Sequence, residues 1–431
     1  MKRGRKAAIL LLVGLMLTAM AGCGGGSSNT GNSASKPQGK VTLQYYTWND
    51  EADYMKKVVE AFNNQNSDIE VKLNMVTSKD DEYNTQIMNN LSGGSQMDIY
   101  SLNGTAMLGT FASKKQLVDL TDRVKAANLD VGAYGPSYQD ITRVLTEGKY
   151  YALPYRTSEY ALFYNKDLFD KAGVKYPTQM TWEEYAQLAI QLTKGDGTSK
   201  QWGGYYADWM IAPLGALQKG ATILDDDLTE VSNFLEYLDR LYYKDQSHMS
   251  YKQMKAESVD WIKQFEGGNV AMLVNGEWTI NMLKADIAAG KAKMNFDMAP
   301  LPLPDGVSEP TTVGGVSTFV GINPNSKNID AAFKFVEFLC GEKGESIIAE
   351  SSVLPAYSSD ATKASFLKAT GIQGSNFFFD AKTVVENQPI AQIDEVNKAF
   401  KEQRDLYLFQ QQPLDKTIKE FENQRKSILG K

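Results

Sequence analysis

The first part of the chain alternates between short apolar stretches with a two-residue period and longer stretches with a helical period. Residues 41–48 and 69–76 alternate along the chain in the way that predicts strands. Between them, residues 54–63 repeat apolar side chains at helical spacing. A second helix is predicted at about 82–91 and a short strand at 98–102. This order predicts an α/β fold with a largely parallel sheet that is covered by helices on both faces.

Strands and helices of the same kind continue in the second part of the chain. Residues 150–153 and 160–164 predict two strands that lead toward a second lobe, and residues 270–274 form a compact apolar strand. Long helical patterns occupy residues 228–243 and 259–265. Ligand groups are then expected in loops at the carboxyl ends of the parallel strands.

Three local signals refine this outline. Thr181, followed three residues later by Glu184, predicts a helix start with a capping box. Residues 299–306 contain three prolines, which cannot donate to a sheet ladder, so we expect an extended surface link there. Gly314 and Gly315 lack the lysine of a phosphate loop and indicate a tight backbone approach to a neutral ligand, or a hinge.

The first 39 residues differ in composition from the rest. Four basic residues precede the uncharged apolar stretch 7–21, which is too short to span a bilayer core of about 30 Å. The stretch ends in small residues before Cys23, the pattern of a lipoprotein signal peptide that is cut before an acylated cysteine. We therefore predict a signal peptide at 1–22 and a flexible tether at 23–39, rich in glycine and serine.

Such an anchor predicts a protein at the extracellular face of the cytoplasmic membrane, held by lipid with acyl chains such as palmitate. A long glycine and serine spacer favours a bacterium with a single membrane. The formal net charge is −7, and it becomes about −11 without the four basic residues of the signal peptide. This charge argues against nucleic acid and anionic membrane surfaces as partners of the folded part.

Composition also limits the chemistry of the chain. His248 is the only histidine, so Ser-His-Asp or Cys-His catalysis would need this one residue, and the usual zinc ligands are missing. The acidic clusters at 80–82, 183–184 and 225–227 lie in polar loop or helix-start contexts. We expect no catalytic residue, no cofactor and no metal site.

The folded part is long enough for two domains, and a hydrophobic fraction of 42% can supply two cores. Of the two cysteines, Cys23 is used by the lipid, so Cys340 has no intramolecular partner. The apolar helical pattern at 331–340 predicts that Cys340 is a small core residue.

Several aromatic side chains lie where strands end or turns begin, each with a polar neighbour. Flat rings hold the apolar faces of sugar rings, while carboxylates, amides and guanidinium groups bind the hydroxyls. Core packing is an equal alternative for any single ring. The aromatic residues are Trp48 with Asp50, Tyr155 with Arg156, Tyr160, Trp209, and Trp278 with Glu277.

Five stretches, taken together and in their order along the chain, resemble the motifs of a known protein family. They are LPYRTS running into ALFYNKDLF (153–169), MTWEE (180–184), FEGGNVAM with NGEW (265–278), PLP with Gly314-Gly315, and 331–339 with Gly344 and 354–356. Together they resemble the family 1 extracellular solute-binding proteins, the carbohydrate receptors of ABC importers.

The resemblance implies a two-lobe periplasmic-binding-protein-like fold of the type II class, with a ligand cleft between lobes joined by hinge strands. The chain would cross between the lobes near Tyr155, near 315–319 and near 354–357. The predicted division is 40–154 plus about 316–354 for the N-terminal lobe, and 155–315 plus about 355–431 for the C-terminal lobe.

The same resemblance implies the function. A sugar or oligosaccharide would bind in the cleft, and a monomeric receptor would deliver it to the transmembrane subunits of an ABC permease. The predicted ligand-binding residues are Trp48, Asp50, Asn103, Arg156, Tyr160, Trp209, Glu277, Trp278 and Gly315.

Two other functions stay open from the residues alone. Arg156 departs from the aromatic or small residue of the family pattern, which leaves a ligand with an acidic group, such as a uronic acid, open. A lipid-anchored glycoside hydrolase, which needs two carboxylates beside the scissile bond, is the alternative function. A surface adhesin without a deep cleft is a third.

Overall fold

The computed structural model describes residues 39–77, 82–94 and 96–430. The predicted signal peptide, the acylated Cys23 and nearly all of the predicted tether lie outside the described residues. Residues from Lys40 onward belong to one unit. None of the helices among the described residues is both long and apolar enough to cross a membrane.

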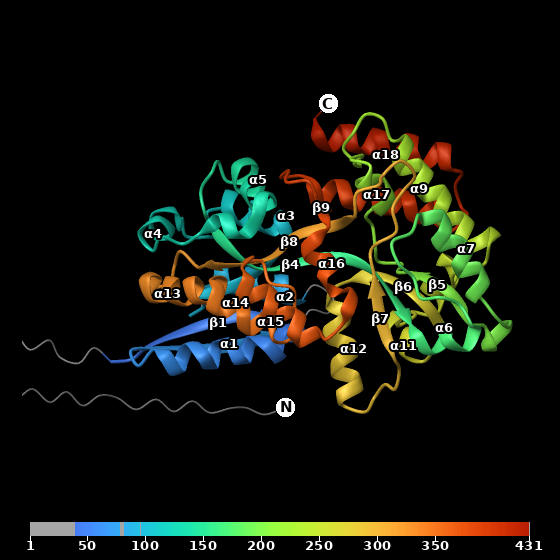
Figure 1. Cartoon of the computed structure of the whole chain (residues 1–431). Coiled ribbons are helices and arrows are strands. Elements are labelled where there is room, and N and C mark those ends of the chain that lie inside the picture. Colours follow the sequence, from blue (N-terminus) through green and yellow to red (C-terminus); the bar gives the residue numbers. More distant parts are fainter. Residues whose placement is uncertain (1–38, 78–81, 95, 431) are drawn as a thin grey trace, which may run out of the picture. The chain divides into compact units, whose positions relative to one another are not determined.

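The described strands form one mixed sheet, shown in Figure 1. They are β1 (Val41–Trp48), β2 (Ile69–Val76), β3 (Ile99–Asn103), β4 (Ala152–Asn165), β5 (Trp202–Tyr206), β6 (Val270–Gly276), β7 (Phe296–Ala299), β8 (Thr311–Ile322) and β9 (Lys382–Val385). The order is β2-β1-β3-β8-β4-β6-β5, with β7 paired to β4 and β9 paired to β8.

The sequence predicted a largely parallel sheet, and this prediction is wrong for the centre of the sheet. β1 pairs in parallel with β2 and β3, and β5 with β6. At the centre, however, β3, β4, β6 and β7 all form antiparallel pairs with β8 or β4. β8 begins about 200 residues after the end of β3, so the local alternation of strands and helices could not predict this pairing.

Helices cover the sheet. The first half contains η1 (Asn49–Glu51), α1 (Ala52–Gln65), α2 (Glu82–Gly93), α3 (Gly104–Ser113), α4 (Thr121–Ala126), η3 (Val131–Tyr134), α5 (Gly135–Leu145), α6 (Lys166–Ala172), α7 (Trp182–Leu192) and η4 (Gly197–Ser199). Then follow α8 (Leu214–Gln218), α9 (Thr229–Asp239), η5 (Arg240–Lys244), α10 (Tyr251–Ala256), α11 (Trp261–Glu266), α12 (Trp278–Ala288), α13 (Ile329–Cys340) and α14 (Glu342–Ala349). The last are α15 (Asp360–Thr370), η6 (Gln373–Asn376), α16 (Phe377–Asp380), α17 (Ile393–Leu408) and α18 (Leu414–Leu429).

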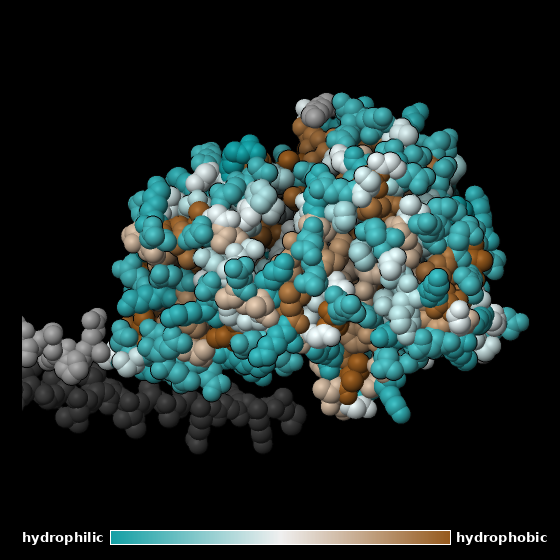
Figure 2. Space-filling model, viewed as in Figure 1, coloured by the Kyte–Doolittle hydropathy of each residue, from teal (hydrophilic) through white to brown (hydrophobic). Residues whose placement is uncertain are grey.

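The apolar side chains gather in three clusters. The first is built on β1, β2 and β3 with α1 and α13, and it draws residues from 43–155 and 316–356. The second is built on β5, β6 and β7 with α7, and it lies mainly within 160–313 and 349–408. The third joins α9, α17 and α18. Because these side chains are buried, hydrophilic residues cover most of the face in Figure 2.

Two strands take part in both large clusters. β4 pairs with β8 over Ala152–Glu159 and then with β6 over Tyr160–Tyr164, so one strand crosses from the first cluster to the second. β8 returns beside it, as Figure 1 shows. The sequence predicted two strands here, at 150–153 and 160–164, because the residues between them are polar. Pairing with β8, through two irregularities near Arg156, makes them one strand.

Other local predictions can be compared with the structure directly. The capping box of Thr181 and Glu184 is confirmed at the start of α7. Cys340 is fully buried, as predicted. The surface link predicted at 299–306 is wrong for most of its length, because residues 301–304 are buried and only 305–306 are exposed.

The Gly314-Gly315 pair lies where β8 contacts the backbone of β4, and the predicted approach to a neutral ligand stays a prediction. A Cβ at Gly314 would lie 1.9 Å from the carbonyl oxygen of Ser158 on β4, which leaves no room for any other residue. Gly315 has φ of +119°, a conformation that residues with a side chain rarely adopt. Glycine at these two positions of β8 therefore allows its pairing with Ser158 and Glu159 of β4.

Candidate ligand-binding site

Three aromatic rings form a cluster where β6 ends. Trp278 is the first residue of α12, and its ring centroid lies 5.9 Å from that of Tyr160 and 5.8 Å from that of Trp209. Trp209 is 37% exposed, which is unusual for so large an apolar side chain. A Cβ at Gly276 would lie 2.0 Å from the Trp278 ring, so this glycine is needed for the indole to lie against the end of the strand.

Arg156, on β4, is the cation between two buried carboxylates. Its Nε and Nη2 lie 3.3 and 3.2 Å from Oε1 of Glu277, and its Nη1 lies 3.7 Å from Oε1 of Glu51. The Arg156 side chain is 16% exposed, and those of Glu51 and Glu277 are 1% and 0% exposed. We call these three residues the Arg156 triad. Burial raises the pKa of both carboxyl groups, and the neighbouring Arg156 opposes that rise.

The Arg156 triad is held by further hydrogen bonds. Oε2 of Glu51 accepts from Oγ1 of Thr47 at 2.8 Å and from the hydroxyl of Tyr155 at 2.7 Å. Oε2 of Glu277 accepts from the backbone N–H of Glu159 at 3.2 Å. The triad thus joins the loop after β1, which belongs to the first cluster, to the loop after β6, which belongs to the second.

Trp48, Asp50 and Asn103 lie at one edge of the sheet. β1 and β3 are parallel neighbours, and the pairing of Tyr46 with Tyr100 places Trp48 level with the end of β3. Trp48 is nearly buried and packs edge-on against Tyr83 with ring centroids 5.0 Å apart, so its indole is mainly a packing group. Asp50 in η1 and Asn103 at the end of β3 are exposed.

The remaining predicted residues lie on β4 and β8. Tyr160 is buried, and its hydroxyl donates to Oε1 of Glu386 at 3.1 Å. Gly315 borders a cavity of about 680 Å³ that Thr157 and Leu354 also line. The structure therefore brings Arg156, Tyr160, Trp209, Glu277 and Trp278 into connected contacts, whereas Gly315 pairs with Ser158 on β4.

Two carboxylates of this region, Glu51 and Glu386, were not predicted from the sequence. Glu51 directly follows Asp50, but nothing in its spacing shows that it is buried against Arg156. Glu386 follows the last residue of β9, so the rule that polar residues follow strand ends would have found it. The sole histidine, His248, is buried, bonds to the hydroxyl of Tyr185 at 2.7 Å, and has its pKa lowered to about 3 by burial.

Glu159 leads to a testable pH dependence. Its carboxyl is buried on β4, with Oε1 accepting from Thr383 at 2.9 Å and Oε2 without a hydrogen bond. Burial raises its pKa to about 8. The unfolded chain has the ordinary, lower value, so the folded state binds the extra proton and loses stability as the pH rises toward 8. From pH 6.5 to 8 we expect a loss of about 2 kcal/mol, measured by urea unfolding.

In the variant Glu159→Gln, the loss of stability over this interval should be smaller than in the wild type by about 2 kcal/mol, while the buried Glu345, whose pKa burial also raises, keeps its own contribution in both proteins. His248 opposes this trend by only about 0.4 kcal/mol, because it is neutral in the folded state and, in the unfolded state, is half protonated at pH 6.5 and loses that proton by pH 8. Glu350→Gln, at an exposed position after α14, is the control and should keep the wild-type slope. An unchanged slope in Glu159→Gln would contradict the assignment.

Comparisons with known proteins identify the family and the fold of the chain. The sequence profile described as bacterial extracellular solute-binding protein matches residues 48–346. A multiple sugar-binding protein of Streptococcus mutans is 21% identical over 359 residues, which are 79% of this chain and 79% of that protein.

Solved structures are similar over most of the chain. The crystal structure of a sugar transporter from Rhizobium etli, in an open conformation, has a TM-score of 0.77 and 28% identity, over 90% of this chain and 99% of that chain. An ABC substrate-binding protein from Listeria monocytogenes in complex with cycloalternan has a TM-score of 0.76 and 23% identity, over 91% and 99%. The predicted two-lobe α/β fold is confirmed.

Proposed function

Because the chain belongs to the bacterial extracellular solute-binding protein family, we propose that it captures a neutral sugar or oligosaccharide and delivers it to an ABC permease. The observation that carries this proposal is the partly exposed cluster of Tyr160, Trp209 and Trp278 beside the Arg156 triad. Aromatic rings next to buried polar groups are what a site for a sugar ring requires. The names of the Streptococcus mutans and Rhizobium etli relatives support a sugar as the substrate class.

A neutral ligand fits the charges better than an acidic one. The sequence left open a uronic acid read by Arg156. That guanidinium already faces two buried carboxylates, Glu51 and Glu277, so the Arg156 triad carries no surplus positive charge for an anion. A ligand carboxylate there would meet like charges at low dielectric.

We propose that the lobes close over the ligand. The proposed lobes are 40–154 with about 316–354, and 155–315 with about 355–431, and the distribution of the two large apolar clusters supports this division. Asp50 and Asn103 would contact the sugar from the first lobe, and Trp209 and Trp278 from the second. Only contacts that the ligand makes in both lobes at once can drive closure.

The proposal includes the membrane anchor. Acylated Cys23, after removal of the signal peptide, would hold the receptor at the extracellular face of the cytoplasmic membrane, where it works as a monomer beside the permease subunits. Mass spectrometry of the protein from its native membrane tests this, because the mature chain should begin at a diacylglyceryl cysteine.

Calorimetric titration with a panel of neutral mono- and oligosaccharides tests the main proposal. A binding sugar at 100 times its dissociation constant should add about 2.7 kcal/mol of stability, which melting curves detect. Glucuronic acid and its oligomers form the charged arm of the panel and should bind at least tenfold more weakly. Binding of no sugar would refute the proposal, and release of 4-nitrophenol from aryl glycosides would favour the hydrolase instead.

A further inference from the structure

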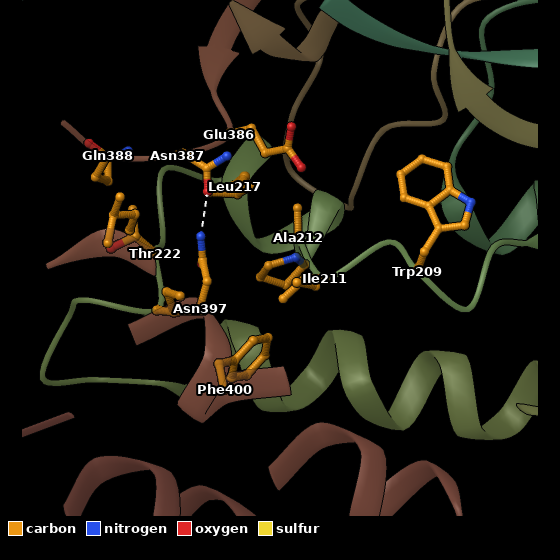
Figure 3. A pocket seen from close by; sticks show the side chains of 13 residues that line it. Trp209, Ile211, Ala212, Leu217, Thr222, Glu386, Asn387, Gln388, Asn397 and Phe400 are labelled. Atoms are coloured by element: carbon orange, nitrogen blue, oxygen red, sulfur yellow. Dashed lines mark hydrogen bonds between the residues drawn. The ribbon is translucent and has the colours of Figure 1, made fainter. Parts of the chain in front are cut away.

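A small cavity opens beside Trp209, between the segment around α8 and the segments that follow β9 and begin α17 (Figure 3). Its volume is about 120 Å³. Its floor is apolar and buried, while its mouth carries partly exposed polar groups. Ala212, Leu217, Ile223 and Phe400 lie on the floor, and Trp209, Glu386 and Gln388 lie at the mouth.

The cavity exists because two apolar clusters meet there. Ala212 and Leu217 belong to the second cluster, and Ile223 and Phe400 belong to the third. Side chains pack closely within a cluster, but the two clusters are built on different helices and leave space where they join. One ordered water needs only about 10 to 15 Å³, and an apolar cavity of about 150 Å³ holds a benzene molecule. The space therefore suits one small apolar group.

Two residues connect the cavity with the proposed sugar site. Trp209 lines the cavity and also contacts Trp278. Glu386 lines it too, and its carboxylate accepts from the hydroxyl of Tyr160. In Figure 3 this carboxylate extends toward the side on which Trp209 lies. A sugar stacked on the aromatic cluster would thus lie at the mouth of the cavity.

We propose that the cavity is a subsite for an apolar aglycone, the aryl or short alkyl group that a glycoside carries at its anomeric oxygen. The proposal rests on the proposed sugar-binding function and narrows its ligand class to glycosides of this kind. A bare sugar ring carries hydroxyls around its edge, and the apolar floor could not hydrogen-bond them, so its burial there would cost free energy. An aryl ring gains from the same floor, while Glu386 and the amides at the mouth remain beside the sugar.

Matched glycosides test the proposal with the full-length protein. We would titrate methyl and 4-nitrophenyl glycosides of glucose, maltose and cellobiose by calorimetry. For the sugar that binds best, the 4-nitrophenyl glycoside should bind at least tenfold more tightly than the methyl glycoside. The variant Ala212→Leu fills the floor and should reduce this ratio below threefold.

Gln388→Trp obstructs the mouth from a partly exposed position and gives a second variant with less risk to folding. Ala289→Leu, an exposed alanine at the end of α12, is the matched control and should keep the wild-type ratio. A ratio near one in the wild type, or a wild-type ratio in both obstructed variants, would overturn the subsite alone. If neither kind of glycoside binds, the proposed function and the subsite fall together.

Discussion

Replacing Arg156 with methionine should lower the free energy of unfolding by about 3 to 5 kcal/mol at pH 7.5. The substitution removes the one cation of the Arg156 triad and leaves Glu51 and Glu277 buried without a charge partner. Two carboxylates in that state must bind protons or draw water into the interior, and both cost stability. Urea unfolding followed by tryptophan fluorescence measures the change.

Two further variants separate the cost of the unpaired buried carboxylates from the cost of losing an arginine side chain. Arg123 and Asp330 form an ion pair at 2.7 Å at the surface, so Arg123→Met should cost less than about 1 kcal/mol. Adding Glu51→Gln and Glu277→Gln to Arg156→Met removes the unpaired charges and should recover much of the loss. If Arg156→Met costs no more than Arg123→Met, the triad does not stabilise the fold in the way described.

Trp278→Ala should weaken sugar binding by about 30-fold or more, which corresponds to the 2 kcal/mol or more of a central aromatic contact. Trp278 contacts both other rings of the cluster, so its removal takes away one stacking surface and leaves Trp209 and Tyr160 without their shared neighbour. Calorimetry with the tightest neutral sugar of the panel measures the effect.

Trp202→Ala is the matched control for this variant. Trp202 pairs with Val270 at the beginning of β6, whereas Trp278 follows the end of that strand, so the two residues belong to opposite ends of the same strand. Binding by Trp202→Ala should equal that of the wild type. Equal loss in both variants would mean that folding, and not stacking, explains the result.

Local patterns predicted the first part of the fold well. β1 and β2 have the bounds that the alternation of apolar and polar residues gave, because alternate side chains in much of each strand are more buried than their neighbours. The start of α7 was predicted from Thr181 and Glu184 alone, since a capping box is complete within four residues. Such features depend only on neighbours in the sequence.

Features that depend on distant partners could not be predicted in this way. The polar stretch between 153 and 160 has no strand pattern, and it is a strand only because β8, more than 150 residues later, pairs with it. The prolines of 299–306 suggested the surface, but Leu301 enters the second cluster. At the site, aromatic residues near strand ends were visible from sequence, whereas the pairing of Arg156 with Glu51 and Glu277 spans more than a hundred residues in each direction.

The sharing of β4 and β8 by both large clusters has a consequence for dissecting the gene. A fragment that stops at Tyr151 would expose the edge of β3, whose partner β8 is encoded far downstream, and open strand edges of this kind promote aggregation. A fragment that begins at Lys166 would likewise deprive β6 of β4. Neither fragment should therefore fold on its own. Insertions and fusions should be tolerated at the chain ends and in loops, but division of the chain between Tyr151 and Lys166 should not be.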